Sequence, residues 1–261
     1  MLYANNQGVR IHYKVEGKGP PLVLQHGLGG DLEMWSLNGF VEALKNDYQL
    51  ILIDARGHGA SDKPHNPEAY RMALRVADVV AVLDELKVSK AHYLGYSMGG
   101  EIGWGIAKYA PERFYSLIIG GSLPYEQDPN EPSPWAEGNI QLLKKGIDAL
   151  VAAAREMWGA RWTPEWEAIT SANDTEAMIA LLSMRERVGF VDVLPTLTVP
   201  CLLYVGEADD LCPYSEVRKC SEIIPNAIFI SFPGLHHIET VFRTDLVLPH
   251  ITRFLAEVGG D

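Results

Sequence analysis

Short apolar runs alternate with glycine-containing turns and helical stretches along the first half of the chain. Residues 22–25, 50–53 and 92–95 are mostly apolar, and each run precedes such a turn, which is typical of central strands covered on both faces. Residues 9–16 alternate between apolar and polar positions, which predicts a half-exposed strand near a sheet edge. Later predicted strands occupy residues 116–119, 201–205 and 227–232. Strands that alternate with helices predict an α/β fold with a mostly parallel sheet.

Three segments of this core have the apolar spacing of amphipathic helices. The first has its stripe at Val76, Val79, Val80, Leu83 and Leu86. The second has Ile102 and Ile106 on its inner face, and Ala110-Pro111 predicts its end. The last has its stripe at Val247, Ile251, Phe254 and Val258. It is predicted to end at Gly259-Gly260, and Pro249 must lie in its first turn or kink it.

The alternation stops between Pro124 and Phe190, where prolines precede patterns that are only helical. Residues 147–158 and 175–188 are predicted helices of this segment. We therefore expect residues 124–190 to form a helical insertion, or cap. Residues 1–123 and 191–261 would together form the core.

Composition narrows the class of protein. With 261 residues and 47% hydrophobic residues, the chain is long enough for one large α/β domain. The net charge of −12 disfavours nucleic acid and anionic membrane as partners, because both call for a basic face. The first residues have no basic and apolar regions of a secretory signal, and the longest weakly polar stretch, residues 115–125, is too short to span a bilayer. Cys201, Cys212 and Cys220 are an odd number, so we expect reduced thiols in a cytoplasmic protein without a membrane span.

Residues 95–99 have the sequence Gly-Tyr-Ser-Met-Gly, a G-x-S-x-G motif. The motif lies between a predicted buried strand and a predicted helix, which is the context that a nucleophilic serine at a strained turn requires. The flanking glycines fit because such a turn leaves no room for neighbouring Cβ atoms. Ser97 is therefore the candidate nucleophile; the alternative is a serine that caps the helix.

Residues 25–30 read Gln-His-Gly-Leu-Gly-Gly and follow an apolar strand. An enzyme that attacks an ester must stabilise an oxyanion, and fixed backbone N–H groups do this well. The expected donors are the amides of Leu28 and Met98. We expect His26 to pin this loop rather than to act in catalysis. The loop contains no Lys or Arg, so it is a poor phosphate cradle.

Three motifs together resemble the α/β-hydrolase superfamily: residues 26–30, residues 54–62 (Asp-Ala-Arg-Gly-His-Gly-Ala-Ser-Asp) and residues 95–100. The resemblance covers essentially the whole chain and is specific for the fold but not for a substrate. It implies an eight-stranded, mostly parallel sheet with helices on both faces and a helical cap after the sixth strand. It also implies a triad in the chain order Ser, acid, His.

The acid and the base follow from the same resemblance. Residues 206–213 (Gly-Glu-Ala-Asp-Asp-Leu-Cys-Pro) are similar to the family's G-x-x-D-x-x-x-P turn, which selects Asp209, with Glu207 and Asp210 as rivals. The base is His236 or His237, and aligning Gly234 with the family's G-x-G-H turn favours His237.

The Asp54 motif has a different interpretation. In the dehalogenase and epoxide-hydrolase branches an aspartate replaces the elbow serine, and here that position is Ser97, which disfavours both reactions. The Asp54 segment is instead predicted to be a turn held by Arg56 and Asp62. The histidines outside the His236-His237 pair do not have metal-ligand spacing, and we expect neither a metal ion nor a cofactor.

The predicted function is hydrolysis of small to medium, largely apolar carboxylic esters through an acyl-enzyme intermediate. Trp135, Trp158 and Trp162 of the insertion are candidate substrate-binding residues, although they could instead pack helices onto the core. The insertion's net charge of −5 (six Lys+Arg, eleven Asp+Glu) makes phosphorylated or polycarboxylate substrates less suitable.

Other functions share these motifs. Residues 97–100 are similar to the elbow of 3-oxoadipate enol-lactonases, so the partner is a small-molecule ester or lactone. The same triad serves carbon–carbon bond hydrolases, and esterase sites with a water-poor acyl pocket can show perhydrolase activity. A further alternative, which is not an enzyme, is a triad-bearing scaffold that binds a ligand.

Overall fold

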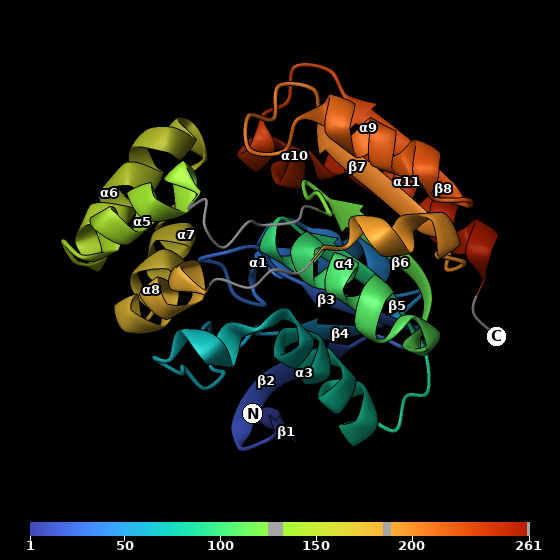
Figure 1. The fold of residues 1–261 in the computed structure, drawn as a ribbon, viewed down its shortest axis with the longest axis horizontal. Helices are drawn as coiled ribbons and strands as arrows, with labels where there is room; N and C mark the ends of the chain where they lie inside the picture. Colours follow the sequence, from blue (N-terminus) through green and yellow to red (C-terminus); the bar gives the residue numbers. More distant parts are fainter. Residues whose placement is uncertain (125–132, 185–188, 260–261) are drawn as a thin grey trace.

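An eight-stranded sheet with the strand order β1-β2-β4-β3-β5-β6-β7-β8 forms the centre of the molecule (Figure 1). The computed structural model describes residues 1–124, 133–184 and 189–259. The strands are β1 (Leu2–Asn6), β2 (Val9–Glu16), β3 (Pro21–Gln25), β4 (Gln49–Ile53), β5 (Ala91–Tyr96), β6 (Phe114–Gly120), β7 (Cys201–Gly206) and β8 (Ala227–Phe232).

The sheet is parallel from β4 to β8, whereas β2 pairs antiparallel with both β1 and β4. The predicted mostly parallel sheet is therefore confirmed. Strand β1 was not predicted, because it is short, contains two asparagines and buries just two of its five residues. The loops that follow β3, β5 and β7 lie at one edge of the sheet, because the carboxyl ends of parallel strands meet there.

Helices cover both faces of the sheet. On β4, Ile51 and Ile53 join the apolar cluster of one face, and Leu50 and Leu52 join that of the other. This alternation is the two-residue period of a strand. The first face packs on α3 (Met72–Glu85), α4 (Met98–Tyr109) and α9 (Tyr214–Ile223), and the second on α1 (Met34–Leu37), α2 (Phe40–Leu44) and α11 (Thr244–Val258). The shorter helices are η1 (Pro67–Tyr70), η2 (Pro111–Arg113), η4 (Val191–Thr196) and α10 (His237–Phe242).

The three core helices lie where the apolar spacing predicted them. Helix α4 ends just before Ala110-Pro111, and α11 ends at Val258, before Gly259. Pro249 is the sixth residue of α11, so it lies beyond the first turn, inside the helix. No helix within residues 1–124, 133–184 and 189–259 is long and apolar enough to cross a membrane.

Four further helices, called here the insertion helices, lie together at one side of the sheet (Figure 1). They are α5 (Pro134–Leu143), α6 (Ile147–Trp158), α7 (Pro164–Ser171) and α8 (Thr175–Ser183), with η3 (Gly159–Arg161) between α6 and α7. Helices α5, α7 and α8 begin at side-chain caps, where Ser133, Thr163 and Asp174 accept backbone N–H groups. Helix α8 ends at Ser183; residues 185–188, which the predicted helix 175–188 included, lie outside the described residues, as do residues 125–132.

The Asp54 segment is held by a wider set of contacts than the predicted pair of Arg56 and Asp62. Arg56 binds Asp78 of α3 through two hydrogen bonds of 2.5 and 2.6 Å, and both side chains are at least 96% buried. Asp62 pairs with Arg10 at 2.9 Å, and its carbonyl accepts the Gly57 amide. The local turn is therefore real, but its two charged residues are anchored by α3 and β2 respectively.

The buried Arg56–Asp78 pair predicts a large stability effect. Asp78→Ala leaves a buried guanidinium without its partner, which we expect to lower the free energy of unfolding by about 3–5 kcal/mol. Asp84→Ala is the matched control, because Asp84 lies on the same helix and pairs with Arg113 at 2.7 Å but is 62% exposed. Its expected effect is about 0–1 kcal/mol. Urea unfolding of both variants measures the difference, and equal losses would contradict the prediction.

Candidate active site

Ser97 lies at a sharp turn between β5 and α4, with φ 54° and ψ −115°. Few non-glycine residues adopt this conformation, which costs on the order of 1–3 kcal/mol. The backbone packs so closely here that an added Cβ would lie 2.3 Å from the Gly99 carbonyl oxygen at Gly95, and 2.1 Å from the Gln25 carbonyl oxygen at Gly99. The glycines of the motif are therefore required by space, as predicted.

The structure brings Ser97, His237 and Asp209 together from the turn after β5, the start of α10 and the loop after β7. His237 Nε2 lies 2.9 Å from Ser97 Oγ, and His237 Nδ1 lies 2.7 Å from Asp209 Oδ2. Asp209 Oδ1 accepts the backbone amides of Leu211 and Cys212 at 3.0 and 2.8 Å. Both oxygens of the buried Asp209 carboxylate therefore have donors, and the histidine is held between a carboxylate and a hydroxyl.

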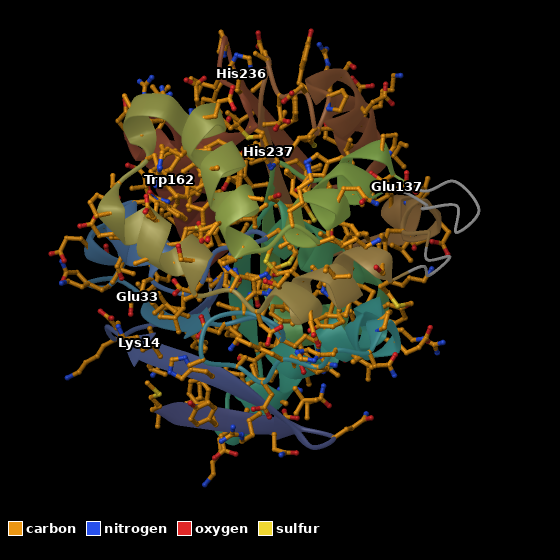
Figure 2. All side chains as sticks on the ribbon, turned by 90° about the vertical axis from the view of Figure 1, so that its left-hand side faces the viewer. Lys14, Glu33, Glu137, Trp162, His236 and His237 are labelled. Carbon is orange, nitrogen blue, oxygen red and sulfur yellow. The ribbon has the colours of Figure 1, made fainter. Side chains whose placement is uncertain are left out.

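The alternative residues at these positions face elsewhere. His236 is exposed and is the N-cap residue of α10, so it lies at the rim of the molecule, whereas His237 lies nearer the middle (Figure 2). Glu207 is exposed and accepts a hydrogen bond from Ser231, and Asp210 is also exposed. The geometry thus separates the candidates that the sequence left open.

The two residues predicted to supply oxyanion donors, Leu28 and Met98, lie on segments next to Ser97. Met98 is the first residue of α4, so its N–H has no partner within the helix. The loop that carries Leu28 passes beside the serine, since an added Cβ at Gly27 would lie 3.5 Å from Ser97 Cβ. This loop is a turn closed by the Gly30 amide on the Gly27 carbonyl at 3.2 Å, with Gly29 at φ +74°.

His26 pins this loop through both ring nitrogens. Nδ1 donates to the Gly27 carbonyl at 2.7 Å, and Nε2 accepts the Ala55 amide at 3.0 Å. Burial lowers the pKa of His26, which favours the neutral ring that this bonding pattern requires. The contacts therefore agree with the structural role expected for His26.

A serine hydroxyl in contact with an imidazole, oriented by a buried carboxylate, can attack a carbonyl carbon. A family model described as the alpha/beta hydrolase fold matches residues 20–163 of the chain. The chain belongs to the α/β hydrolase fold family.

The proteins similar in sequence to this chain include a lactonase and an esterase. A 3-oxoadipate enol-lactonase from Acinetobacter baylyi is 29% identical over 230 residues, which cover 80% of this chain and 79% of that protein. A pimeloyl-[acyl-carrier protein] methyl ester esterase from Aeromonas hydrophila is 31% identical over 254 residues, which cover 92% and 96%. The crystal structure of an enol-lactonase from Burkholderia xenovorans superposes with a TM-score of 0.85 at 25% identity and covers 98% of this chain and all of that one (100%). These similarities support a hydrolytic enzyme.

The insertion helices of this α/β hydrolase contact the Leu28 loop and helix α10, which begins with His237. Asn173, at the end of α7, donates through Nδ2 to the Gly29 carbonyl at 2.9 Å, and Leu28 packs on the apolar cluster of α5 and α8. Arg161 of η3 pairs with Glu239 of α10 at 2.6 Å. Sequence analysis missed these contacts, because they join residues far apart in the chain and no local motif marks them.

The three candidate tryptophans of the insertion occupy different surroundings. Trp135 is 42% exposed on α5. Trp158 packs edge-on against Trp162, Trp166 and Phe242, with ring centroids 4.8–5.4 Å apart. The aromatic cluster thus joins α6 and α7 to α10, and substrate contact by these residues stays a prediction.

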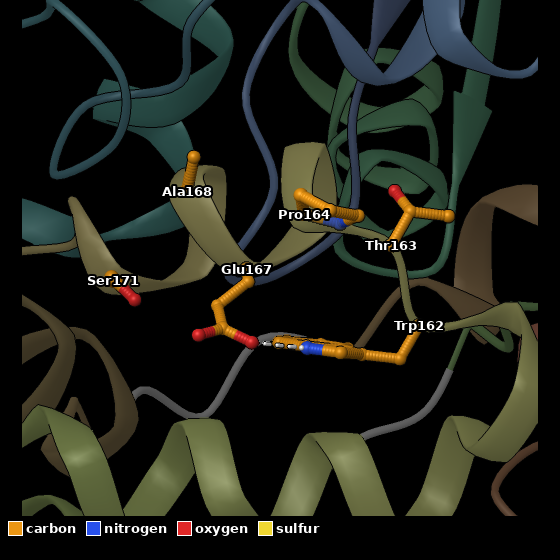
Figure 3. A pocket seen from close by; sticks show the side chains of 6 residues that line it. All are labelled: Trp162, Thr163, Pro164, Glu167, Ala168 and Ser171. Atoms are coloured by element: carbon orange, nitrogen blue, oxygen red, sulfur yellow. Dashed lines mark hydrogen bonds between the residues drawn. The ribbon is translucent and has the colours of Figure 1, made fainter.

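A hollow of about 590 Å³ opens on the insertion (Figure 3). It is lined by Trp162, Thr163, Pro164, Glu167, Ala168 and Ser171. Glu167 accepts hydrogen bonds from the Trp162 ring at 2.8 Å and from Arg155 at 2.6 Å. Ser97, Asp209 and His237 are not among these lining residues. Among the described residues, no group of three or more His, Cys, Asp or Glu side chains could hold a metal ion.

The burial of His58 next to His26 should make the free energy of unfolding depend on pH. Burial lowers the pKa of His58 from 6.5 to about 3, and the neighbouring His26 acts in the same direction. In the unfolded chain the ring binds a proton as the pH falls below about 6.5, so the free energy of unfolding falls between about pH 6.5 and pH 3, by up to about 1.4 kcal/mol per pH unit. We expect His58→Asn to reduce this slope. Urea unfolding across the range tests it, and an unchanged slope would contradict it.

Proposed function

We propose that the protein is a serine hydrolase of carboxylic esters, with Ser97 as nucleophile, His237 as general base and Asp209 as its orienting carboxylate. The observation that carries this proposal is the chain of contacts from Asp209 Oδ2 to His237 to Ser97 Oγ, at 2.7 and 2.9 Å. The strained turn at Ser97 supports it too, because strain of this kind clusters at active sites.

In the first step, His237 Nε2 takes the proton of the Ser97 hydroxyl while Oγ attacks the ester carbonyl carbon. The carbonyl oxygen becomes an oxyanion, and the amides of Leu28 and Met98 stabilise it. His237 then gives its proton to the departing alkoxide oxygen. The carbon–oxygen bond breaks, an alcohol leaves, and an acyl group stays on Ser97.

In the second step, His237 takes a proton from water, whose oxygen attacks the acyl carbon. The second oxyanion collapses, the bond to Ser97 Oγ breaks, and His237 returns the proton to the serine. Asp209 stabilises the positive imidazolium in both steps without taking the proton. The products are an acid and the free enzyme.

The substrate class is proposed to be small to medium, largely apolar esters, with residues 124–190 acting as a cap over the site. This is supported by the apolar packing of Leu28 against the insertion helices. The two described arginines of the insertion that bind carboxylates, Arg155 and Arg161, are paired with Glu167 and Glu239, which leaves their charges neutralised. Trp135, Trp158 and Trp162 of the insertion are the candidate residues for contact with the substrate.

Hydrolysis of p-nitrophenyl butyrate tests the proposed triad. We expect Ser97→Ala to lower kcat by about 10⁴-fold or more, because the remaining donors and binding cannot replace the nucleophile. His237→Asn is expected to cause a loss of similar size. His236→Asn is the matched control, because it places a good N-cap residue at the start of α10 and should leave kcat within about twofold.

A fluorophosphonate probe gives an independent readout of the nucleophile. Mass spectrometry should locate the adduct on Ser97 in the wild type and find none there in Ser97→Ala. Nitrophenol release at equal rates by the wild type and Ser97→Ala would refute the proposal and favour a ligand-binding scaffold.

A second candidate function is hydrolysis of an enol-lactone, favoured by the similarity to the Acinetobacter and Burkholderia enol-lactonases over most of the chain. A panel of simple esters, enol-lactones and carbon–carbon hydrolase substrates, compared by kcat/KM, separates the candidates. If esters are the substrates, we expect kcat/KM for butyrate esters to exceed that for the 3-oxoadipate enol-lactone by at least about tenfold, a difference of about 1.4 kcal/mol in transition-state binding. A preference for the lactone would replace the ester proposal.

A further inference from the structure

Tyr96, the residue before Ser97, joins the serine turn to the helix that carries His237. Its hydroxyl donates a hydrogen bond to the backbone carbonyl of His237 at 2.5 Å. The two rings also pack together, with centroids 5.3 Å apart. Tyr96 is 3% exposed and His237 is 6% exposed, so the contact lies in the interior, where a hydrogen bond is stronger than in water.

This contact closes a ring of bonds around the serine and the histidine. A peptide bond joins Tyr96 to Ser97, the Tyr96 hydroxyl binds the His237 carbonyl, and His237 Nε2 lies 2.9 Å from Ser97 Oγ. Asp209 holds the ring of His237, whereas Tyr96 holds its backbone. Since a histidine side chain has two rotatable bonds, the place of its backbone decides where Nε2 can lie.

The surrounding backbone leaves room for this link. At Gly121, where φ is +54°, an added Cβ would lie 2.9 Å from the Tyr96 hydroxyl oxygen and 3.1 Å from His237 Cε1. Any side chain there would press on both partners. The space between β6 and α10 is thus shaped around the tyrosine and the histidine together.

We propose that Tyr96 is a positioning residue for acyl transfer, whose hydroxyl fixes the His237 backbone so that Nε2 lies within proton-transfer distance of Ser97. The proposal rests on the proposed function of Ser97 and His237. The G-x-S-x-G pattern leaves the identity of residue 96 open, so the motif by itself gives this position no role.

The tyrosine acts as a donor over the whole working range of pH. Burial raises the pKa of the Tyr96 phenol well above its ordinary value, and the nearby Tyr204 and Asp209 act in the same direction. The phenol therefore stays protonated and keeps its hydrogen atom for the His237 carbonyl. Because Tyr96 is buried and acts through the histidine, we expect loss of its hydroxyl to lower kcat and to leave KM nearly unchanged.

Tyr204 offers a matched control. Its ring centroid lies 5.9 Å from that of Tyr96, and it is 1% exposed. Its hydroxyl is buried and has no hydrogen-bond partner among the residues that the structure describes. Tyr96→Phe and Tyr204→Phe therefore remove the same atom from neighbouring places in one core cluster, but one of them also breaks the link to His237.

The test measures kcat and KM for p-nitrophenyl butyrate at a temperature where urea unfolding shows each variant to be folded. We expect Tyr96→Phe to lower kcat by about 10- to 100-fold with KM within about twofold, because small misplacements of reacting groups are costly. Tyr204→Phe should leave both constants within about twofold of the wild type. Equal kcat in the two variants, or a change in KM alone, would overturn the proposal.

A second measurement needs no turnover. The proton between His237 Nδ1 and Asp209 should give a low-field NMR signal, assigned by its loss in His237→Asn. We expect this signal to shift or broaden in Tyr96→Phe and to stay in place in Tyr204→Phe; an unchanged signal in both refutes the proposal. If the wild type hydrolyses no ester but the signal moves in Tyr96→Phe alone, the proposed function fails while the positioning of His237 by Tyr96 stands.

Discussion

The left-handed backbone of Ser97 is the constraint on which the rest of the site depends. It turns the chain from a buried central strand directly into a helix, and it does so between the backbones of β3 and β6. Such a conformation persists because its surroundings over-determine it. The Ser97 amide binds the Gly120 carbonyl at 2.9 Å, and the Gly99 position touches the Gln25 carbonyl. The stability of the two-sided core therefore maintains the strain at one residue.

Much of this architecture could be predicted because local patterns in the sequence indicate it. Continuous apolar runs identified the central strands, 3.6-residue spacing identified α3, α4 and α11, and the glycines around Ser97 identified the turn. The edge strand β1 escaped prediction, because its five residues carry too little apolar alternation to stand out. Of the two placements predicted for Pro249, in the first turn or at a kink, the first is wrong, because Pro249 lies inside α11.

The residues of the candidate site could be predicted only in part from the sequence. Ser97 follows from its own motif, but the choice between His236 and His237 depends on which ring the start of α10 turns inward. That choice is made by tertiary contacts with Asp209 and Tyr96, which lie 28 and 141 residues away in sequence. Arg56 illustrates the same limit, since its partner Asp78 lies on a helix that no pattern around residue 56 indicates. Short-range rules thus find the candidate nucleophile, and contacts between residues far apart in sequence select the side chains that surround it.

The contacts of Asn173 with the Gly29 carbonyl and of Arg161 with Glu239 tie the insertion to both sides of the site. The insertion helices are therefore not an independent module. In evolution or in chimaera design, exchanging them for the corresponding segment of another family member would remove contacts that support the Gly29 loop and helix α10. A lineage that acquires a new substrate by this route must keep these two anchors, or find replacements for them, before the new specificity becomes useful.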